Sequence, residues 1–91
     1  MYKIKTTNRF EKDFIKCISR KFDIQAIELV IEQLESSGKL PSKYKSHLLS
    51  GNFKGFWECH VKPDWLLIWH QNEKDKTIEL VRTGTHADLF K

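Results

Sequence analysis

The sequence predicts an α+β fold in which an N-terminal helical hairpin packs on one face of an antiparallel sheet. Two observations support this prediction. Apolar residues recur at helical spacing in the first part of the chain, whereas the second half is rich in the β-branched and aromatic residues that are typical of strands. Because 91 residues support only one core, we expect a single domain over residues 1–91 with the element order β-α-α-β-β-β.

The first elements are expected to be a short strand and two helices. Residues 2–6 (YKIKT) alternate enough for a strand, and Thr7 or Asn8 is placed to begin a helix. Asp23 can cap a second helix, whose apolar period continues until Gly38 ends it. The first helix carries an apolar face that we expect in the core: Phe10, Phe14, Cys17 and Ile18.

Three later segments have the composition of strands: residues 53–61, 65–70 and 77–82. Strand side chains alternate between faces, so the odd residues of the first segment belong to the core. The even ones, Lys54, Glu58 and His60 among them, belong to a face that we expect to be open. Pro63 has no N–H for the sheet and ends this strand, which leaves Asp64 at the rim of the open face.

The composition favours a cytoplasmic protein with polyanionic partners. Lysine and arginine number 16 against 12 acidic residues, which gives a net charge of +4. Residues 36–57 contain no carboxylate but four lysines. No apolar run approaches the ~18 residues of a membrane span, and the N-terminus has no apolar signal-peptide region, so we expect no membrane partner. The two cysteines have no metal-site spacing and are expected to be reduced.

Histidines at strand ends and loops are the first candidates for chemistry. Of the four in the chain, His47 leads into the sheet, His60 ends a strand and His86 follows the last strand. We expect these three to meet Asp64 at one edge of the sheet, whereas His70 lies within a strand and is left out. The imidazole group, with a pKa near ~6.5, is a natural acid or base.

Cleavage of RNA fits these residue types better than other chemistry. RNA carries its own nucleophile, the 2′-hydroxyl, so an enzyme needs only a base, an acid and cations around the phosphate. Histidines, Asp64 and lysines supply those groups without a metal ion or another cofactor. Exposed aromatic residues such as Phe56, Trp65 and Phe90 are candidates to stack on an unpaired base, although Trp65 is equally suited to the core.

Two rival chemistries have weaker support in the sequence. Cys59 and His60 are strand neighbours that point to opposite faces, so they do not grip one ion without a bulge. A zinc site made of His47, His60 and His86 is an open but less favoured alternative, and we expect no metal. Ser50 lies near His47, but there is no GxSxG motif of a serine hydrolase.

The second half of the chain resembles the YafQ-like branch of the RelE superfamily of bacterial toxins. The layout of the first half agrees, including residues 10–14 (FEKDF) at the start of the first helix. The resemblance rests on four separated blocks in the family's order and spacing: residues 47–51 (HLLSG), 54–55 (KG), 58–68 (ECHVKPDWLLI) and 82–90 (RTGTHADLF).

The resemblance implies the toxin of a type II toxin–antitoxin system, a ribosome-dependent messenger-RNA endonuclease that leaves a 2′,3′-cyclic phosphate and a 5′-hydroxyl without a metal. For the catalytic residues we expect His86 as the general acid and Asp64 with His60 as the activators of the 2′-hydroxyl. His47 and Lys54 are expected to steady the phosphate.

The resemblance also implies RNA-binding positions at Trp65 and Phe90, to which we add Arg82. Strand parity groups Arg82 with the expected core residues Ile78 and Leu80. Either a bulge turns Arg82 outward or this residue is structural.

The expected partners are the ribosome, messenger RNA and a cognate antitoxin that is acidic and partly disordered alone. Operator DNA is a further expected partner through the antitoxin complex. Two alternatives stay open at this point. One is a non-catalytic basic module that binds RNA or the ribosome, and the other is a degenerate toxin that keeps only antitoxin binding.

Overall fold

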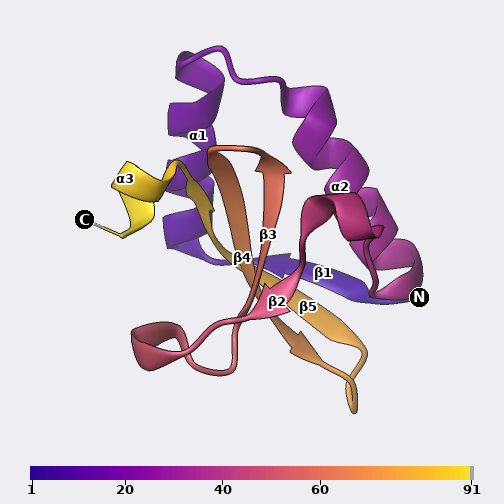
Figure 1. Ribbon diagram of the computed structural model, residues 1–91. Coiled ribbons are helices and arrows are strands. Elements are labelled where there is room, and N and C mark those ends of the chain that lie inside the picture. The colour runs from indigo at the N-terminus through magenta and orange to yellow at the C-terminus, as the bar shows by residue number, and fades with distance from the viewer. Residues whose placement is uncertain (91) are drawn as a thin grey trace.

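The computed structural model describes residues 1–90 as a five-stranded sheet with helices against it (Figure 1). The strands lie in the order β1-β5-β4-β3-β2, so the first strand of the chain lies beside the last. The predicted α+β fold with a helical hairpin is confirmed. The elements are β1 Lys3–Thr6, α1 Asn8–Ser19, α2 Ile24–Ser37, the 3₁₀ turn η1 Ser42–Tyr44, β2 His47–Leu48, the 3₁₀ turn η2 Gly51–Phe53, β3 Trp57–Lys62, β4 Trp65–Asn72, β5 Thr77–Gly84 and α3 His86–Leu89.

β1 departs from the predicted antiparallel sheet. Its residues pair with β5 in parallel, from Lys3 opposite Thr77 to Thr6 opposite Leu80. The pairs that join β2, β3, β4 and β5 are antiparallel, as predicted. Helices and three strands separate β1 from β5 along the chain, so no tight turn fixes their relative direction and a parallel pair is accessible. The sheet is therefore mixed.

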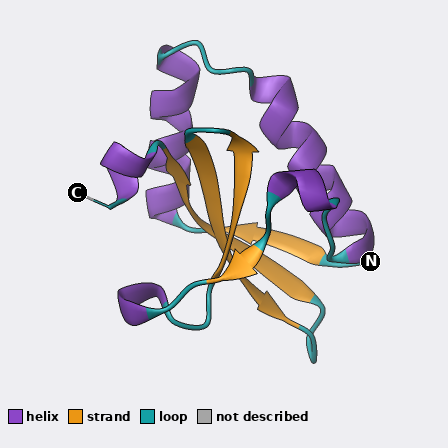
Figure 2. Ribbon diagram, viewed as in Figure 1, coloured by secondary structure: helices purple, strands orange, loops and turns teal. Residues whose placement is uncertain are grey.

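The predicted hairpin of α1 and α2 covers one face of the sheet (Figure 2). The Thr7 hydroxyl accepts a hydrogen bond of 3.0 Å from the N–H of Phe10, which satisfies a free amide at the start of α1. α2 ends at Gly38, whose φ of +71° is a conformation that favours glycine. Asp23 lies at the N-cap of α2, as predicted, but its carboxylate makes no capping hydrogen bond.

The main core lies between this hairpin and the sheet. Ile18 was predicted to join it but is 49% exposed, because it lies on the solvent side of α1. Both cysteines are buried and unpaired, and burial raises the pKa of the Cys59 thiol to about 12. Within residues 1–90 no helix has the length and apolar composition to cross a membrane. The core includes Phe10, Cys17, Ile27, Val30, Leu34, Cys59, Leu67, Trp69, Ile78 and Leu80.

The opposite face of the sheet is partly covered, contrary to the prediction of an open face. β4 is apolar on both sides, so both of its faces require cover. Leu66 and Ile68 point away from the hairpin and are fully buried beneath Leu89 of α3. Partly buried residues from the segment between β2 and β3 complete this second cluster: Leu49, Phe53 and Phe56.

This cover explains why one predicted strand is too long. The sequence predicted a strand from residue 53, but β3 begins only at Trp57. Residues 51–53 form the 3₁₀ turn η2 instead, and the N–H of Phe56 donates to the carbonyl of Phe53. The segment thus folds back over the sheet, which places Phe53 and Phe56 in the second cluster.

Candidate active site

Of the four residues that the sequence predicted to meet, His60, Asp64 and His86 lie together at one end of the sheet. His60 lies near the end of β3, Asp64 lies in the turn to β4, and His86 is the first residue of α3. The ring centroids of His60 and His86 are 5.8 Å apart. Three segments that are distant in the sequence therefore place two imidazole rings and a carboxylate together.

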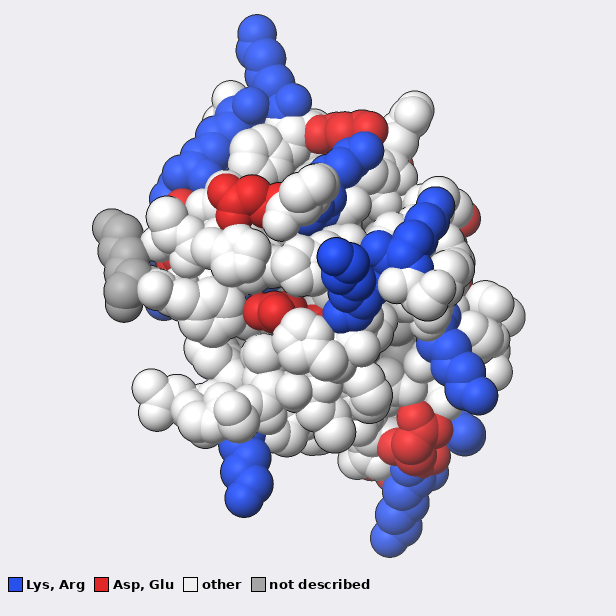
Figure 3. Space-filling view, viewed as in Figure 1, with Lys and Arg blue, Asp and Glu red and all other residues white. Residues whose placement is uncertain are grey.

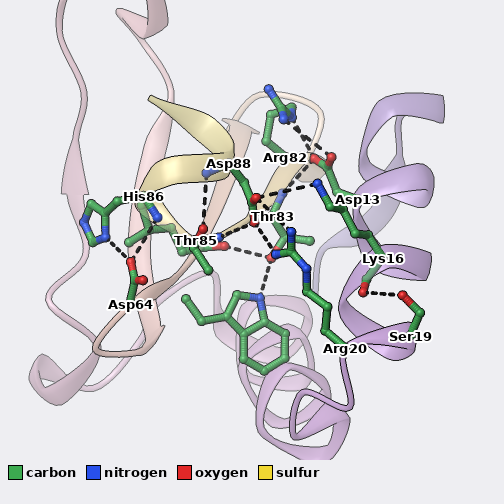
Figure 4. Close-up of polar contacts among 12 residues, drawn as sticks. Asp13, Lys16, Ser19, Arg20, Asp64, Arg82, Thr83, Thr85, His86 and Asp88 are labelled. Atoms are coloured by element: carbon green, nitrogen blue, oxygen red, sulfur yellow. Dashed lines mark hydrogen bonds and ion pairs between the residues drawn. The ribbon is translucent and has the colours of Figure 1, made fainter. Parts of the chain in front are cut away.

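Asp64 fixes the orientation of His86. Its Oδ1 accepts a hydrogen bond of 3.0 Å from the backbone N–H of His86 and lies 2.5 Å from Nδ1 of the same residue (Figure 4). These contacts hold the pKa of the Asp64 carboxyl below its ordinary value, the backbone hydrogen bond being the largest cause. Nδ1 of His86 therefore donates to a carboxylate, and Nε2 is left for substrate.

His60 is oriented by its own turn. Its Nδ1 lies 3.3 Å from the carbonyl oxygen of Pro63, an acceptor only, so Nδ1 carries the proton in the neutral ring. The Nε2 lone pair is then free to accept a proton. The sequence predicted that Asp64 assists His60, whereas the structure pairs Asp64 with His86.

α3 is held in place by Asp88, which sequence reasoning missed. The Asp88 carboxylate accepts a hydrogen bond from the N–H of Thr85 and a 2.8 Å hydrogen bond from Nη1 of Arg20 on α1. The Thr85 hydroxyl in turn accepts from the N–H of Asp88, which completes a capping box. Above all the hydrogen bond from Arg20 holds the pKa of the Asp88 carboxyl well below its usual range. This network fixes the start of α3 and with it His86.

His47 lies on the edge strand β2, in register with Glu58 of β3. Its Nε2 is 3.2 Å from Oε1 of Glu58, and its Nδ1 is 3.0 Å from the carbonyl oxygen of Lys45. Glu58 precedes His60 by two residues, so the two side chains share a face of β3. Sequence reasoning placed Glu58 in solvent, but this residue is only 6% exposed. The signal in the sequence that could have pointed to Glu58 as a site residue was the position of its carboxylate two residues before the candidate His60.

Trp65 is buried and so is not placed to contact RNA, contrary to the prediction. It is 3% exposed and packs edge-on against Phe22, with ring centroids 4.9 Å apart. Its Nε1–H donates a 2.9 Å hydrogen bond to the hydroxyl of Thr83. The register of β3 and β4 shifts between His60 and Lys62, so Trp65 lies opposite Lys62 and faces the helices. A buried indole is not available to stack on a base.

Arg82 is turned toward α1. A register shift in β5 separates Leu80 from Arg82, so the bulge considered from the sequence is present. The Arg82 Nε donates a 2.7 Å hydrogen bond to Oδ2 of Asp13, which also accepts from the N–H of Thr83 at 3.2 Å. Asp13 thus occupies the β5 edge beyond the end of β1. The guanidinium is paired there and is not free toward the histidines.

Phe90 and Lys54 keep their predicted exposure. Phe90 is 44% exposed, and its ring packs edge-on against Phe53 with centroids 5.7 Å apart. Its N–H donates to the carbonyl of His86, which ties it to the candidate acid. Lys54 is exposed at the end of η2. Their contact with RNA stays a prediction.

No group of three or more histidine, cysteine, aspartate or glutamate residues within residues 1–90 is arranged to hold a metal ion. The three-histidine alternative therefore has no preformed ligand set. His47 is engaged with Glu58, whereas His60 and His86 face each other.

Known proteins share both the fold and the sequence. The family model described as "Bacterial toxin of type II toxin-antitoxin system, YafQ" matches residues 2–91. The chain is 36% identical over 88 residues to the mRNA interferase toxin YafQ of Escherichia coli strain K12, which covers 96% of this chain and 94% of that protein.

Solved structures agree over the whole length. The crystal structure of the E. coli DinJ–YafQ complex matches with a TM-score of 0.90 and 34% identity, over 100% of both chains. The crystal structure of a metal-bound toxin from Helicobacter pylori matches with a TM-score of 0.89 and 39% identity, over 99% of this chain and 100% of that chain.

The mixed sheet, the helical hairpin and the histidine cluster together define a RelE-like toxin domain. Within that class, the family model and the identity over nearly the full length are specific. The chain belongs to the YafQ family of bacterial type II toxin–antitoxin toxins.

Proposed function

We propose that this protein is an endoribonuclease that cuts messenger RNA on the ribosome by metal-independent acid and base catalysis. The observation that carries the proposal is the pair of imidazole rings 5.8 Å apart, one of which is oriented by Asp64. The name of the E. coli relative, an mRNA interferase, supports the substrate. The likeness to the RelE superfamily supports the dependence on the ribosome.

The proposed reaction uses the substrate's own nucleophile. His60 accepts the proton of the 2′-hydroxyl at Nε2 as the 2′-oxygen bonds to phosphorus. The bond between phosphorus and the 5′-oxygen breaks, and His86 donates its Nε2 proton to that oxygen. The products are a 2′,3′-cyclic phosphate and a 5′-hydroxyl.

The remaining residues support the phosphate and the acid. Asp64 accepts hydrogen bonds from His86, and its lowered pKa makes it a poor proton acceptor from the 2′-hydroxyl, so we assign it the positioning of the acid. The exposed Lys54 contributes positive charge at the phosphate, and His47, held by Glu58, steadies the phosphate.

We further propose a cognate antitoxin as the partner that silences the toxin in the cytoplasm, and operator DNA as a partner of the resulting complex. The crystal structure of DinJ bound to the E. coli relative supports such a partner. Coexpression of an acidic protein encoded beside this gene should relieve growth arrest by the toxin.

Primer extension on ribosome-bound message tests the activity. New 5′ ends are expected from the wild type and not from His86→Ala, in a buffer that keeps the magnesium the ribosome needs and contains a chelator selective for transition metals. The upstream fragments should carry a 2′,3′-cyclic phosphate. A basic module that only binds gives salt-dependent binding and no new ends. The metal-bound relative makes the transition-metal chelator essential, since loss of cleavage under the chelator that an added transition metal restores refutes the metal-independent mechanism.

A further inference from the structure

A hollow of about 700 Å³ opens beside the candidate active site. It lies between the first half of α2, the turn η1 and the β3–β4 turn, and His60 forms part of its wall. Apolar groups line it as well: Ala26, Leu29, Tyr44, Val61 and Pro63. The hollow and the imidazole pair therefore share His60.

The hollow carries an excess of positive charge. Lys43 and Lys45 reach it from the segment between α2 and β2, and Lys62 reaches it from the end of β3. Asp23 is the one carboxylate among the described lining residues, and it lies 3.8 Å from Nζ of Lys62. Lysine and arginine side chains gather over η1 in the space-filling view (Figure 3). Three ammonium groups thus face one carboxylate.

We propose that this hollow binds the single-stranded RNA that adjoins the scissile phosphate, through its three lysines. The inference rests on the proposed endoribonuclease function and assigns a substrate-binding surface outside the histidine cluster. A phosphate held between His60 and His86 belongs to a continuous strand, and that strand passes His60 on leaving the cluster. The lysines line the hollow of which His60 forms a wall, where further phosphates need counter-charges.

The lining favours contacts with phosphate over recognition of a base. Tyr44 is the aromatic residue of the lining, but it is 7% exposed and the Lys43 ammonium lies 5.1 Å from its ring centroid. No broad aromatic face is therefore presented for stacking. Binding in the hollow should consequently depend strongly on salt and weakly on base identity.

Substitution of Asp23 should change RNA binding in the direction opposite to substitution of the lysines. A phosphate at Lys62 displaces or competes with the Asp23 carboxylate, so Asp23→Asn should tighten the binding of RNA. The side chain makes no capping hydrogen bond, and asparagine is an equally good N-cap residue, so the substitution leaves α2 intact.

The experiment uses ribosomes programmed with a defined message and toxin in excess, so that the maximal rate and the half-saturating toxin concentration are measured separately. K43Q/K45Q/K62Q is expected to raise the half-saturating concentration roughly 10-fold or more, and to make its logarithmic salt dependence shallower by about two. The maximal rate should stay within about twofold of wild type.

Asp23→Asn should lower the half-saturating concentration. The matched control is K3Q/K5Q/K74Q, which removes the same charge from exposed positions on β1 and the β4–β5 turn.

Photocrosslinking separates contact with message from contact with ribosomal RNA. With 4-thiouridine placed on each side of the scissile phosphate in turn, one position should crosslink to residues 43–45 or 60–63. The inference is overturned if K43Q/K45Q/K62Q has the same half-saturating concentration as K3Q/K5Q/K74Q. It is also overturned if the crosslinks are confined to other segments. It is equally overturned if the lysine substitutions weaken only antitoxin binding. A wild-type protein that yields no cleaved message refutes the proposed function instead, so the two failures are distinct.

Discussion

One oxygen of Asp64 accepts hydrogen bonds from both the backbone N–H and the ring Nδ1 of His86. Asp64→Ala removes both acceptors, and Asp64→Asn keeps an acceptor but removes the charge. Cleavage is expected to fall by about 10²-fold in the alanine variant and by less in the asparagine variant. Single-turnover cleavage measures this order, with circular dichroism as the control for folding. Equal rates in all three proteins contradict the positioning role.

The lowered pKa of Asp64 sets where this contact fails. The pKa of the Asp64 carboxyl is depressed in the folded protein, so this group is charged at any pH above the ordinary carboxyl pKa. It loses its contact only as the pH falls through the depressed pKa. The Asp64–His86 contact is therefore present throughout the neutral range. It should weaken only in acid, which NMR of the His86 ring detects.

His60 and His86 are predicted to control opposite limbs of the pH dependence. A base must be unprotonated, so His60→Ala should remove the rise of the rate with pH. An acid must be protonated, so His86→Ala should remove the fall of the rate at higher pH. Each variant is expected to lose roughly 10²-fold in single-turnover rate. If His60→Ala instead removes the fall of the rate at higher pH and His86→Ala removes the rise, the assignment of acid and base is reversed.

Glu58 and His47 are predicted to act as a unit. Glu58→Gln leaves His47 without its charged partner, and His47→Ala removes the ring itself. Because the two side chains contact each other, their effects on cleavage should not add, and the double variant should be no slower than His47→Ala. The four proteins of this cycle are compared by single-turnover cleavage. Additive losses would show that the two residues act independently.

Asp88 is predicted to stabilise the fold in a pH-dependent way. Asp88→Asn weakens the hydrogen bonds to Arg20 and Thr85 and should cost about 1–2 kcal/mol of unfolding free energy at pH 7. The pKa of Asp88 is depressed, so its stabilisation is complete above the ordinary carboxyl pKa and is lost as the pH falls toward the depressed value. Urea unfolding of both proteins at pH 7 and pH 3 should show the difference shrinking in acid.

Trp65 is predicted to matter for stability and not for contact with RNA. Trp65→Phe keeps an aromatic ring but removes the donor to Thr83, so about 1–2 kcal/mol of stability should be lost. At a temperature where the variant is folded, its half-saturating toxin concentration should equal that of wild type. A large rise in that concentration with unchanged stability restores the RNA-binding role.

Local patterns predicted most of this molecule because they reflect local physics. Helical spacing and the turn conformation at Gly38 placed the two helices, and Pro63 marked the strand end that brings Asp64 to the rim. The parallel direction of β1 was not predictable, since it depends on pairing between opposite ends of the chain. For the same reason the sequence did not reveal that Asp88 reaches Arg20.

The errors at the site come from single-residue shifts of register. Alternation placed Lys62 beside His60, but the bulge between them turns Lys62 and Trp65 toward the helices. Alternation in residues 53–61 predicted one open face of the sheet, but β4 is apolar on both sides and its second face is covered, and Glu58 of β3 is buried as well. A bulge leaves no signal in one sequence, because it depends on what packs against the strand. The unbroken apolar run of β4, in contrast, was a signal that both of its faces are covered.

The placement of β5 and α3 has a consequence for the nascent chain during its synthesis on the ribosome. β5 lies inside the sheet between β4 and β1, and His86 follows directly after it in the chain. A polypeptide that has emerged from its own ribosome only as far as β4 lacks both this interior strand and His86, the proposed proton donor. If the proposed pair of His60 and His86 is catalytic, each copy should therefore spare the message that encodes it while it is being made, because a nascent copy lacks one of the two residues.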